Sequence, residues 1–309
     1  MKRRIFVIGG AGFLGRASCN RLRSTNNIVV CDSPQRLRSL ETFGLMTVDY
    51  DFGQDPTYKI ACEPGDIAVI FSWRGYPEAH EQDPVGKLSL NLDHTLKLVR
   101  WLVDRGVSEV IYASSGGAVY GNCGWEPVKE DAALNPVGFY GIGKVTAEMY
   151  VRKALSESGA RHIILRIGNA YGPGQIANRL SVGLIAKAVL AARTGKPLEV
   201  WGSGENRRDY IHVEDIATAV RSVIETPQLP AGAYNVGTAK SVSTKEVITL
   251  VERTLGLKVP LVERAKRGFD VGNICLNTTA IRVETGWEPE WTIEQGIMQM
   301  NGILDSQTP

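Results

Sequence analysis

The chain has 309 residues, a formal net charge of +2 and a hydrophobic content of 43%. A chain of this length and apolarity can bury a large core, which excludes a mainly disordered protein and predicts either two domains or one α/β domain with a smaller lobe. A charge this close to zero gives no reason to expect a nucleic acid or a membrane surface as partner. Glycine is the exception in composition, because 33 of the 309 residues are glycine, which is above the average usage of about 7%.

The cysteines and histidines predict neither a disulfide framework nor a metal site. The five cysteines are odd in number and include no C-x-x-C pair, and the four histidines show no ligand spacing. The first residues imitate a signal peptide, but the apolar run 5–8 is short and no cleavage site follows it. No stretch reaches about 18 apolar residues, so no membrane span is expected. We therefore expect a cytoplasmic protein with reduced thiols.

Apolar runs and helical patterns alternate along the first 170 residues. Strands are predicted at 5–8, 28–30, 67–71, 110–113 and 163–166, and helices at 13–24, 91–104 and 140–156. Strands alternating with helices at this spacing are typical of right-handed βαβ units. The sequence thus predicts an α/β fold with a doubly wound parallel sheet of the Rossmann type.

The alternation ends after about residue 170. Helices are expected at 180–193 and 215–225, only short elements after them, and a frayed tail at 306–309. We predict a larger domain formed by 1–170 and about 207–237. The smaller C-terminal lobe is predicted to consist of 171–206 and 238–309, so that the chain crosses between the two more than once.

A glycine cluster follows the first predicted strand and opens the first predicted helix. Gly9, Gly12 and Gly15 fit the pattern G-x-x-G-x-x-G, and Gly10 with the last two fits G-x-G-x-x-G. This spacing provides a tight turn, a bare backbone beside a pyrophosphate and a helix N-terminus with free N–H groups. A glycine turn without any ligand is the alternative for the motif alone.

An acidic residue at the end of the second predicted strand strengthens the dinucleotide interpretation. Asp32 lies 20 residues after Gly12, where a carboxylate accepts hydrogen bonds from the adenosine ribose and repels a 2′-phosphate. The sequence therefore favours NAD over NADP as the cofactor. Arg36 and Arg38 lie close by and count slightly against this preference.

A Y-x-x-x-K pair is the candidate reacting group. Tyr140 and Lys144 are four residues apart on a predicted helix, so their side chains share a face. Tyrosine has a pKa of about 10, and a nearby ammonium together with the positive nicotinamide of NAD would lower that pKa. A packed tyrosine near a solvated lysine is the alternative for the pair alone. Ser114 and Ser115, at the end of an upstream strand, favour function.

Together these motifs resemble the extended short-chain dehydrogenase/reductases, in the NAD-dependent sugar-nucleotide epimerase/dehydratase group, and most of all its UDP-glucose 4-epimerase-like branch. The resemblance covers nearly the whole chain. It also rests on Val119-Tyr120-Gly121, on the LRIGNAYGP run that ends at Pro173, and on the RDY and RGFDV runs that begin at Arg208 and Arg267. It implies that the larger domain binds NAD and that the smaller lobe binds a nucleotide-diphosphate sugar.

The resemblance also implies residue roles. Tyr140 is expected to be the catalytic acid/base, Lys144 its partner, and Ser115 a hydrogen-bond partner of the reacting sugar hydroxyl. The expected cofactor-binding residues are Gly9, Gly12, Phe13, Leu14, Asp32, Asp49, Trp73, Asn91, Tyr140 and Lys144.

The expected substrate-binding residues are Asn169, Arg208 and Arg267, which match positions that hold the diphosphate or the nucleoside. Guanidinium forks suit phosphate oxygens. An ion pair at the surface or between lobes is the alternative for each arginine.

Two departures from the family pattern affect the site. The hydroxyl residue usually stands four before the tyrosine of V-Y-G, where this chain has Gly116. Counting from the strand instead selects Ser115, with Ser114 as the alternative. Trp73 stands where the family usually has alanine, at a place expected to face NAD, and the adjoining Arg74 is also unusual.

The residues before V-Y-G help to choose among the reactions of the family. Dehydratases carry an Asp-Glu pair there and decarboxylases a glutamate, but this chain has Gly117 and Ala118, which cannot transfer a proton. A 4-ketoreductase commonly consumes NADPH, against which Asp32 argues. We therefore predict a nucleotide-sugar 4-epimerase (an isomerase of polysaccharide biosynthesis, acting on a UDP-hexose).

Three alternatives stay open: a 4-ketoreductase, a 4,6-dehydratase, and a catalytically weak NAD-binding scaffold or sensor. A homodimer through the helices 91–104 and 140–156 is expected from the resemblance, with neither a nucleic acid nor a membrane as partner.

Overall fold

The computed structural model describes residues 2–38, 40, 44–53, 60–175 and 183–306. Its centre is a seven-stranded parallel sheet with the order β10-β6-β5-β4-β1-β2-β3. The strands are β1 (Arg4–Ile8), β2 (Asn27–Asp32), β3 (Met46–Asp49), β4 (Ile67–Ile70), β5 (Glu109–Ser115), β6 (Arg161–Ile167) and β10 (Gly232–Val236). The strand order reverses between β1 and β4, which confirms the predicted doubly wound sheet.

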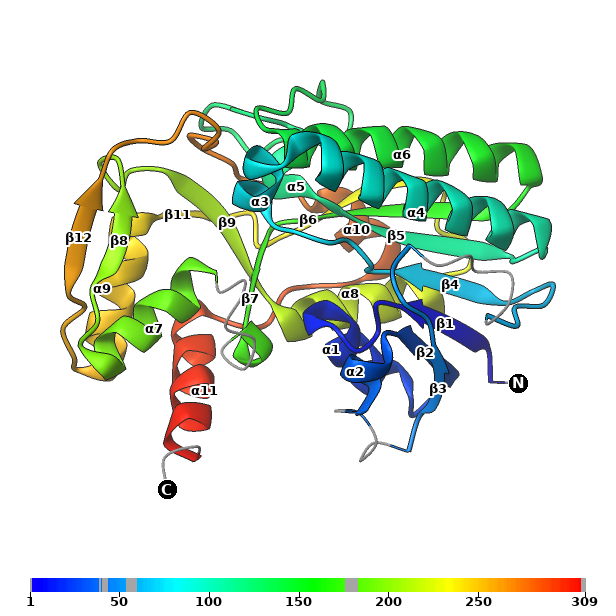
Figure 1. The fold of residues 1–309 in the computed structure, drawn as a ribbon, viewed down its shortest axis with the longest axis horizontal. Helices are drawn as coiled ribbons and strands as arrows, with labels where there is room; N and C mark the ends of the chain where they lie inside the picture. The colour runs from blue at the N-terminus through cyan, green and yellow to red at the C-terminus, as the bar shows by residue number, and fades with distance from the viewer. Residues whose placement is uncertain (1, 39, 41–43, 54–59, 176–182, 307–309) are drawn as a thin grey trace.

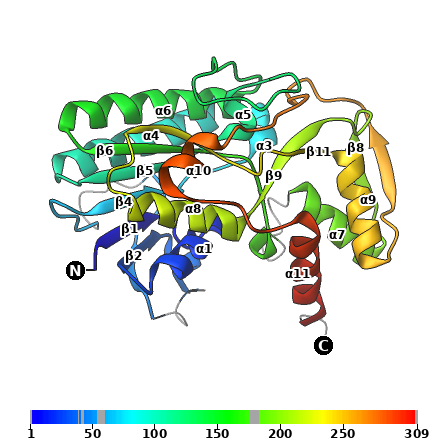
Figure 2. The same cartoon turned by 180° about the vertical axis from the view of Figure 1, so that it is seen from behind.

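Helices cover both faces of this sheet (Figures 1 and 2). The helices on one face are α3 (Pro77–Gln82), α4 (Pro84–Asp104) and α6 (Phe139–Ser158), and those on the other are α1 (Phe13–Leu22), α8 (Val213–Glu225) and α10 (Thr279–Thr285). Two short helices, α2 (Pro34–Leu37) and α5 (Gly116–Val119), follow β2 and β5. Because both faces are covered, strands such as β1 are buried along almost their whole length.

The smaller lobe lies beyond the carboxyl ends of the central strands (Figure 1). Its strands form a three-stranded sheet, β11-β9-β7, and a two-stranded sheet, β12-β8. The elements are β7 (Asn169–Tyr171), the 3-10 turn η3 (Pro173–Gln175), α7 (Leu184–Thr194), β8 (Leu198–Trp201), β9 (Arg207–His212), β11 (Ser241–Ser243), α9 (Thr244–Leu255), β12 (Leu261–Arg264) and α11 (Ile293–Ser306). A separate apolar core holds α7, α9 and α11 together.

The expectation of only short elements after 215–225 is wrong, because α9 and α11 are full-length helices. The start of α9 carries a capping box, in which Ser243 Oγ accepts from Glu246 N at 3.1 Å and the Glu246 carboxylate accepts from Ser243 N at 2.7 Å. This S-x-x-E signal was readable in the sequence. Residues 180–182 of one predicted helix and 307–309 of the predicted tail lie outside the described residues.

The chain crosses between the two parts of the molecule several times. Helix α8 and strand β10 return to the central sheet after α7, as Figure 2 shows. Ile281 and Trp287, which the predicted division assigns to the smaller lobe, pack in the same core as α8. This segment therefore lies with the larger domain.

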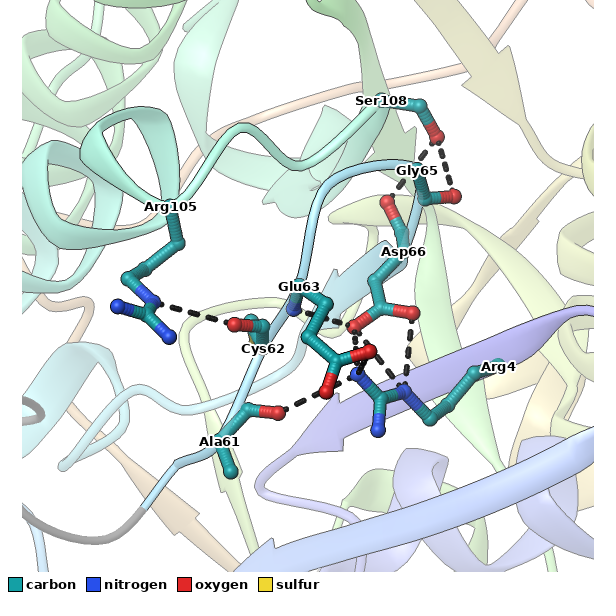
Figure 3. A network of polar contacts seen from close by, with 8 residues as sticks. All are labelled: Arg4, Ala61, Cys62, Glu63, Gly65, Asp66, Arg105 and Ser108. Atoms are coloured by element: carbon teal, nitrogen blue, oxygen red, sulfur yellow. Dashed lines mark hydrogen bonds and ion pairs between the residues drawn. The ribbon is translucent and has the colours of Figure 1, made fainter.

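An ion-pair network fastens the amino ends of β1 and β4 (Figure 3). Arg4 Nε and Nη2 donate to the two carboxylate oxygens of Asp66 at 3.0 and 2.7 Å, and Glu63 N donates to the same carboxylate at 2.7 Å. Ser108 Oγ donates to the Asp66 carbonyl at 3.0 Å. The amino edge of the sheet is thus closed by its own residues, whereas the carboxyl edge faces a cavity.

Candidate active site

A cavity of about 770 Å³ lies between the carboxyl ends of the central strands and the smaller lobe. From the larger domain it is lined by the first residues of α1, the segment after β4, the ends of β5 and β6 with the residues that follow them, and by residues of α3 and the first two turns of α6. From the smaller lobe it is lined by side chains of α7 and β9 and by the segment after β12. In doubly wound sheets this edge, at the point where the strand order reverses, is where ligands bind.

The glycine turn joins β1 to α1, next to residues that line the cavity. A Cβ at Gly9, whose φ is +81°, would lie 2.8 Å from Ser72 N, and a Cβ at Gly15 would lie 2.3 Å from Gly9 O. Side chains are therefore excluded where β1, the loop after β4 and α1 meet. Helix α1 starts at Gly12 without a side-chain cap, and Phe13 and Leu14 line the cavity. An uncapped helix N-terminus beside bare backbone fits a pyrophosphate.

Asp32 ties the glycine turn to the end of β2. Its carboxylate accepts from Ala11 N at 3.0 Å and from Ser33 N at 2.8 Å, and Arg36 Nη1 lies 3.9 Å from it. Asp49 is its register partner on β3, so both carboxylates lie at the carboxyl edge of the sheet. An oriented carboxylate with remaining lone pairs fits the hydroxyls of an adenosine ribose. Arg36 faces this carboxylate as an ion-pair partner.

Asn91 on α4 is fully buried and lies behind the loop that follows β4. Its side-chain amide donates to Arg74 O at 2.9 Å and to Lys87 O at 2.8 Å, and its oxygen accepts from Arg74 N at 2.7 Å. The side chain therefore acts on the cavity by fixing the backbone beside Trp73.

Tyr140 lies in the first turn of α6 and lines the cavity. Burial raises the pKa of the Tyr140 hydroxyl to about 12, while a hydrogen bond with Ser115 acts in the opposite direction. Ser115 also lines the cavity, at the end of β5. Ser114 lines the cavity as well, but it is buried and its Oγ donates to the Glu148 carboxylate. Of the two serines, Ser115 is the one beside the tyrosine.

Lys144 lies one turn further along α6, and only 4% of its surface is exposed. Its Nζ donates to Ala113 O at 2.9 Å. Burial lowers the pKa of Lys144 to about 7, against which the charge of Glu148 acts. The predicted pair is therefore side by side in the site, with a lysine whose protonation changes near neutral pH.

Trp73 covers this lysine. Lys144 Nζ lies 4.2 Å from the centroid of the indole ring, and the Tyr140 ring meets that indole edge-on at a centroid distance of 6.2 Å. The unusual tryptophan thus forms part of the cavity wall, as expected, and contacts both members of the pair.

His80 on α3 is a member of the site that the sequence analysis missed. It is fully buried, its ring stacks on Trp73 at a centroid distance of 6.0 Å, and it lies edge-on to Tyr140 at 5.3 Å. No spacing signal pointed to this histidine, because α3 is brought to α6 only by the tertiary fold. Glu78, Glu81 and Lys187 also line the cavity without such a signal.

The expected substrate residues also line the cavity. Asn169, Arg208 and Arg267 all belong to its wall. Arg267 forms a two-pronged ion pair with Asp270, at 3.0 and 2.9 Å, whereas burial lowers the pKa of Arg208. Guanidinium groups in this position fit the oxygens of a diphosphate.

The segment between Ser115 and V-Y-G brings no acidic side chain to the cavity. Gly117 and Ala118 line the wall at this point. A Cβ at Gly117 would lie 2.8 Å from Asn169 Oδ1, and a Cβ at Gly116 would lie 2.7 Å from the Leu276 side chain. The backbone of α5 is therefore pressed against its neighbours.

The part of the chain that the structure describes contains no group of three or more His, Cys, Asp or Glu side chains that could hold a metal ion. The five cysteines are free thiols. None of the described helices is both long and apolar enough to cross a membrane.

Comparison with known proteins gives consistent matches over the whole chain. A family model described as the NAD dependent epimerase/dehydratase family matches residues 5–237. The UDP-glucose 4-epimerase of Mycolicibacterium smegmatis is 30% identical over 311 residues, which cover 95% of this chain and 96% of that protein. The dTDP-4-dehydro-6-deoxyglucose reductase of Escherichia coli is 27% identical over 305 residues, 96% of each chain.

Solved structures match the fold equally well. The UDP-glucose 4-epimerase of Thermus thermophilus, determined in complex with NAD, has a TM-score of 0.86 and 24% identity, covering 99% of this chain and 100% of that one. The likeness extends over both the larger domain and the smaller lobe.

Proposed function

Because the chain belongs to the NAD-dependent epimerase/dehydratase family, we propose that it is a nucleotide-sugar 4-epimerase that acts on a UDP-hexose. NAD is the cofactor of this family and is bound in related structures. The observation that carries the proposal is the composition of the cavity wall. It holds Tyr140, Lys144 and Ser115 but has Gly117 and Ala118 where a second acid–base pair would have to lie.

A 4-epimerase needs one proton-transferring group, a polar partner for it and a reversible hydride acceptor. Bound NAD would supply that reversible hydride acceptor for C4 of the sugar. Tyr140 takes the proton of the 4-hydroxyl and gives it back, and Ser115 orients that oxygen. The redox balance over the cycle is zero, because the sugar that is oxidised is also the one reduced.

The electrostatics of the site support this role for Tyr140. Burial holds the pKa of its hydroxyl near 12 in the protein alone. The ammonium of Lys144 and the positive nicotinamide both favour the phenolate, so the pKa should fall when the cofactor binds. Ionisation of the base would then be coupled to occupation of the site.

Arg208 and Arg267 would hold the diphosphate while the 4-keto sugar turns. Both arginines line the cavity from the smaller lobe, where a charged anchor would leave the hexose ring free. Asn169, near Gly117, would contact the same ligand.

A 4-ketoreductase is the second candidate, because one of the relatives bears the name of a reductase. A 4,6-dehydratase is disfavoured because Gly117 and Ala118 occupy the positions before V-Y-G at which dehydratases of the family carry an acid–base pair. A catalytically weak NAD-binding scaffold or sensor is disfavoured by the intact Tyr140 and Lys144 pair.

We further propose a cytoplasmic homodimer with a role in polysaccharide biosynthesis. Ile142 and Met149 are exposed apolar residues of α6, at 41% and 66%, and support a second copy packing on this helix. Neither a nucleic acid nor a membrane is an expected partner.

The proposal is tested by incubating the purified protein with UDP-glucose or UDP-N-acetylglucosamine and following C4 configuration by NMR. We expect the C4 epimer to form without added cofactor. Turnover that needs NADPH and a 4-keto sugar would instead identify a reductase, and NAD binding without turnover of any nucleotide sugar would favour the scaffold.

Two variants of α6 make this assay specific. Tyr140→Phe should lower the rate by about 10²- to 10⁴-fold, because proton transfer is lost. Tyr150→Phe, on the same helix but packed against the core, should leave the rate unchanged. Equal rates for the two variants would rule out Tyr140 as the acid/base.

A further inference from the structure

We propose that Trp73 is a positioning residue for Lys144, whose indole face stabilises the ammonium form and holds it against the Ala113 carbonyl. This inference rests on the proposed function only in taking Lys144 as the partner of the catalytic tyrosine. The argument uses the contacts of the indole, the room that α6 makes for it, and the groups that surround the ammonium.

The indole lies where a cation benefits most from an aromatic ring. Lys144 Nζ is 4.2 Å from the Trp73 centroid and 5.1 Å from the Tyr112 centroid, so the ammonium is enclosed by two ring faces. A cation within about 6 Å of a tryptophan face is attracted by the ring quadrupole, and more strongly where water is excluded. With only 4% of the lysine exposed, this attraction replaces part of the lost hydration.

Helix α6 is shaped to admit the indole. Gly143 directly precedes Lys144, and a Cβ there would lie 3.1 Å from Trp73 Cζ2 and 3.0 Å from Leu88 Cδ1. Glycine inside a helix costs about 1 kcal/mol relative to alanine. The close approach of Trp73 to the bare backbone explains why a glycine stands at this position. The surface of α6 and the indole ring are therefore complementary in shape.

His80 fixes the orientation of the ring. Its Nε2 lies 3.3 Å from Trp73 Nε1 and 3.2 Å from the Arg74 carbonyl oxygen, so polar contacts hold the imidazole beside the indole and the loop after β4. Burial lowers the pKa of His80, which favours its neutral form, while the contact with the Arg74 carbonyl acts in the opposite direction. The stacked His80 and Trp73 rings also meet the Tyr140 ring edge-on, so one aromatic group contacts both members of the catalytic pair.

The other groups around the ammonium are Glu148 and Tyr140 on α6, Tyr112 on β5 and His80 on α3. Glu148 is already bound by Arg166 of β6, with Arg166 Nη2 donating at 2.9 Å. The negative charge that favours the ammonium is therefore shared with an arginine. This leaves Trp73 as a substantial stabilising contact that can be varied without changing any charge.

The test is the titration of Lys144 in the protein without sugar nucleotide or added NAD. Competitive labelling with acetic anhydride, followed by mass spectrometry of the peptide that contains Lys144, gives the titration midpoint, with the exposed Lys97 as internal reference. In Trp73→Leu the site stays apolar but the ring face is lost, so the midpoint should fall by about 0.4 to 1.5 pH units. Trp73→Phe keeps a ring and should titrate close to the wild type.

Gly143→Ala provides a second variant that leaves the tryptophan in place. The added Cβ pushes the indole away, so its midpoint should lie between those of the wild type and Trp73→Leu. An unchanged midpoint in Trp73→Leu would overturn the proposal, as would a rise. If that variant does not fold, an unchanged midpoint in Gly143→Ala overturns it. Trp101→Phe, in the core beneath α4, is the matched control and should not shift the midpoint.

Because the readout needs no substrate, failure here is distinguishable from failure of the proposed function. A protein that epimerises nucleotide sugars yet shows no dependence of the Lys144 titration on Trp73 would refute only this inference. A protein that turns over no sugar could still show the dependence in full.

Discussion

Lys144 illustrates how a reacting residue is held at a cost to folding. Its ammonium is buried beneath Trp73, with one hydrogen bond, from Nζ to the Ala113 carbonyl. Burial lowers the pKa of Lys144 from its ordinary 10.5 to about 7. Between pH 7 and 10.5 the unfolded chain therefore binds more protons at this position than the folded chain, and the contribution of Lys144 to stability rises with pH through that window.

Replacing this lysine should stabilise the fold while abolishing activity. For Lys144→Met we expect the free energy of unfolding at pH 7 to rise by roughly 1–3 kcal/mol, since no charge has to be buried. The advantage should shrink as the pH approaches 10.5. Urea unfolding at several pH values measures it, with Lys97→Met, at an exposed site of α4, as the control. A variant less stable than the wild type at pH 6 to 7, with no pH dependence, would contradict this interpretation.

At the scale of an element, two glycines in the loop after helix α5 share a backbone conformation but differ in how closely they are packed. Gly121, the glycine of V-Y-G, has a φ of +71°, and a Cβ there would lie 2.0 Å from the Asn135 carbonyl oxygen. Gly124 has a similar φ of +62°, but a Cβ there would meet no heavy atom within 4 Å. The two positions therefore separate the effect of backbone conformation from that of close packing.

This pair yields a prediction about stability. Gly124→Ala should lose about 1–2 kcal/mol from left-handed strain alone. Gly121→Ala should lose at least about 3 kcal/mol, because a backbone oxygen cannot move aside cheaply. Denaturant unfolding of both variants gives the comparison. Equal losses would show that Gly121 is not packed against the Asn135 carbonyl as described.

Elements differed in how readily they could be predicted. The glycine turn, Asp32 and the Tyr140–Lys144 pair were found from sequence because each depends on spacing within one βα unit or one helix. The helix α9 was missed although its Ser243–Glu246 capping box was readable. His80 could not have been found, because its role depends on α3 packing beside α6 and Trp73, a contact with no local signature.

At the scale of the whole molecule, the cavity lies between two parts that we propose bind different ligands. The larger domain contributes Tyr140 and Lys144 to the cavity wall, and the smaller lobe contributes Arg208 and Arg267. Arg208 Nη1 donates to the Arg207 carbonyl at 2.9 Å, and burial lowers the pKa of Arg208 while the charge of Asp270 acts in the opposite direction. We expect the charge of Arg208 to be available to a diphosphate, whereas that of Arg267 is shared with Asp270.

Substitution of Arg208 should therefore separate the two ligands. In Arg208→Met we expect affinity for UDP-glucose to fall by about 10- to 100-fold, the value of one charge-assisted contact. Affinity for NAD should stay within about twofold of the wild type. Calorimetric titration with each ligand measures both, and Arg100→Met, at an exposed site of α4, should change neither. A parallel loss of NAD binding would show that the arginine supports the cofactor site instead.

The transfer of hydrogen at C4 is the most direct test of the whole account. UDP-glucose carrying deuterium at C4 should be converted to its C4 epimer with the label retained at C4, in water and without added nicotinamide cofactor. The label is expected to return because, in the proposed cycle, the hydrogen that leaves C4 as hydride is the one given back to C4. Epimer without the label, or no epimer at all, would contradict the assignment of Tyr140, Lys144 and Ser115 to reversible oxidation at this carbon.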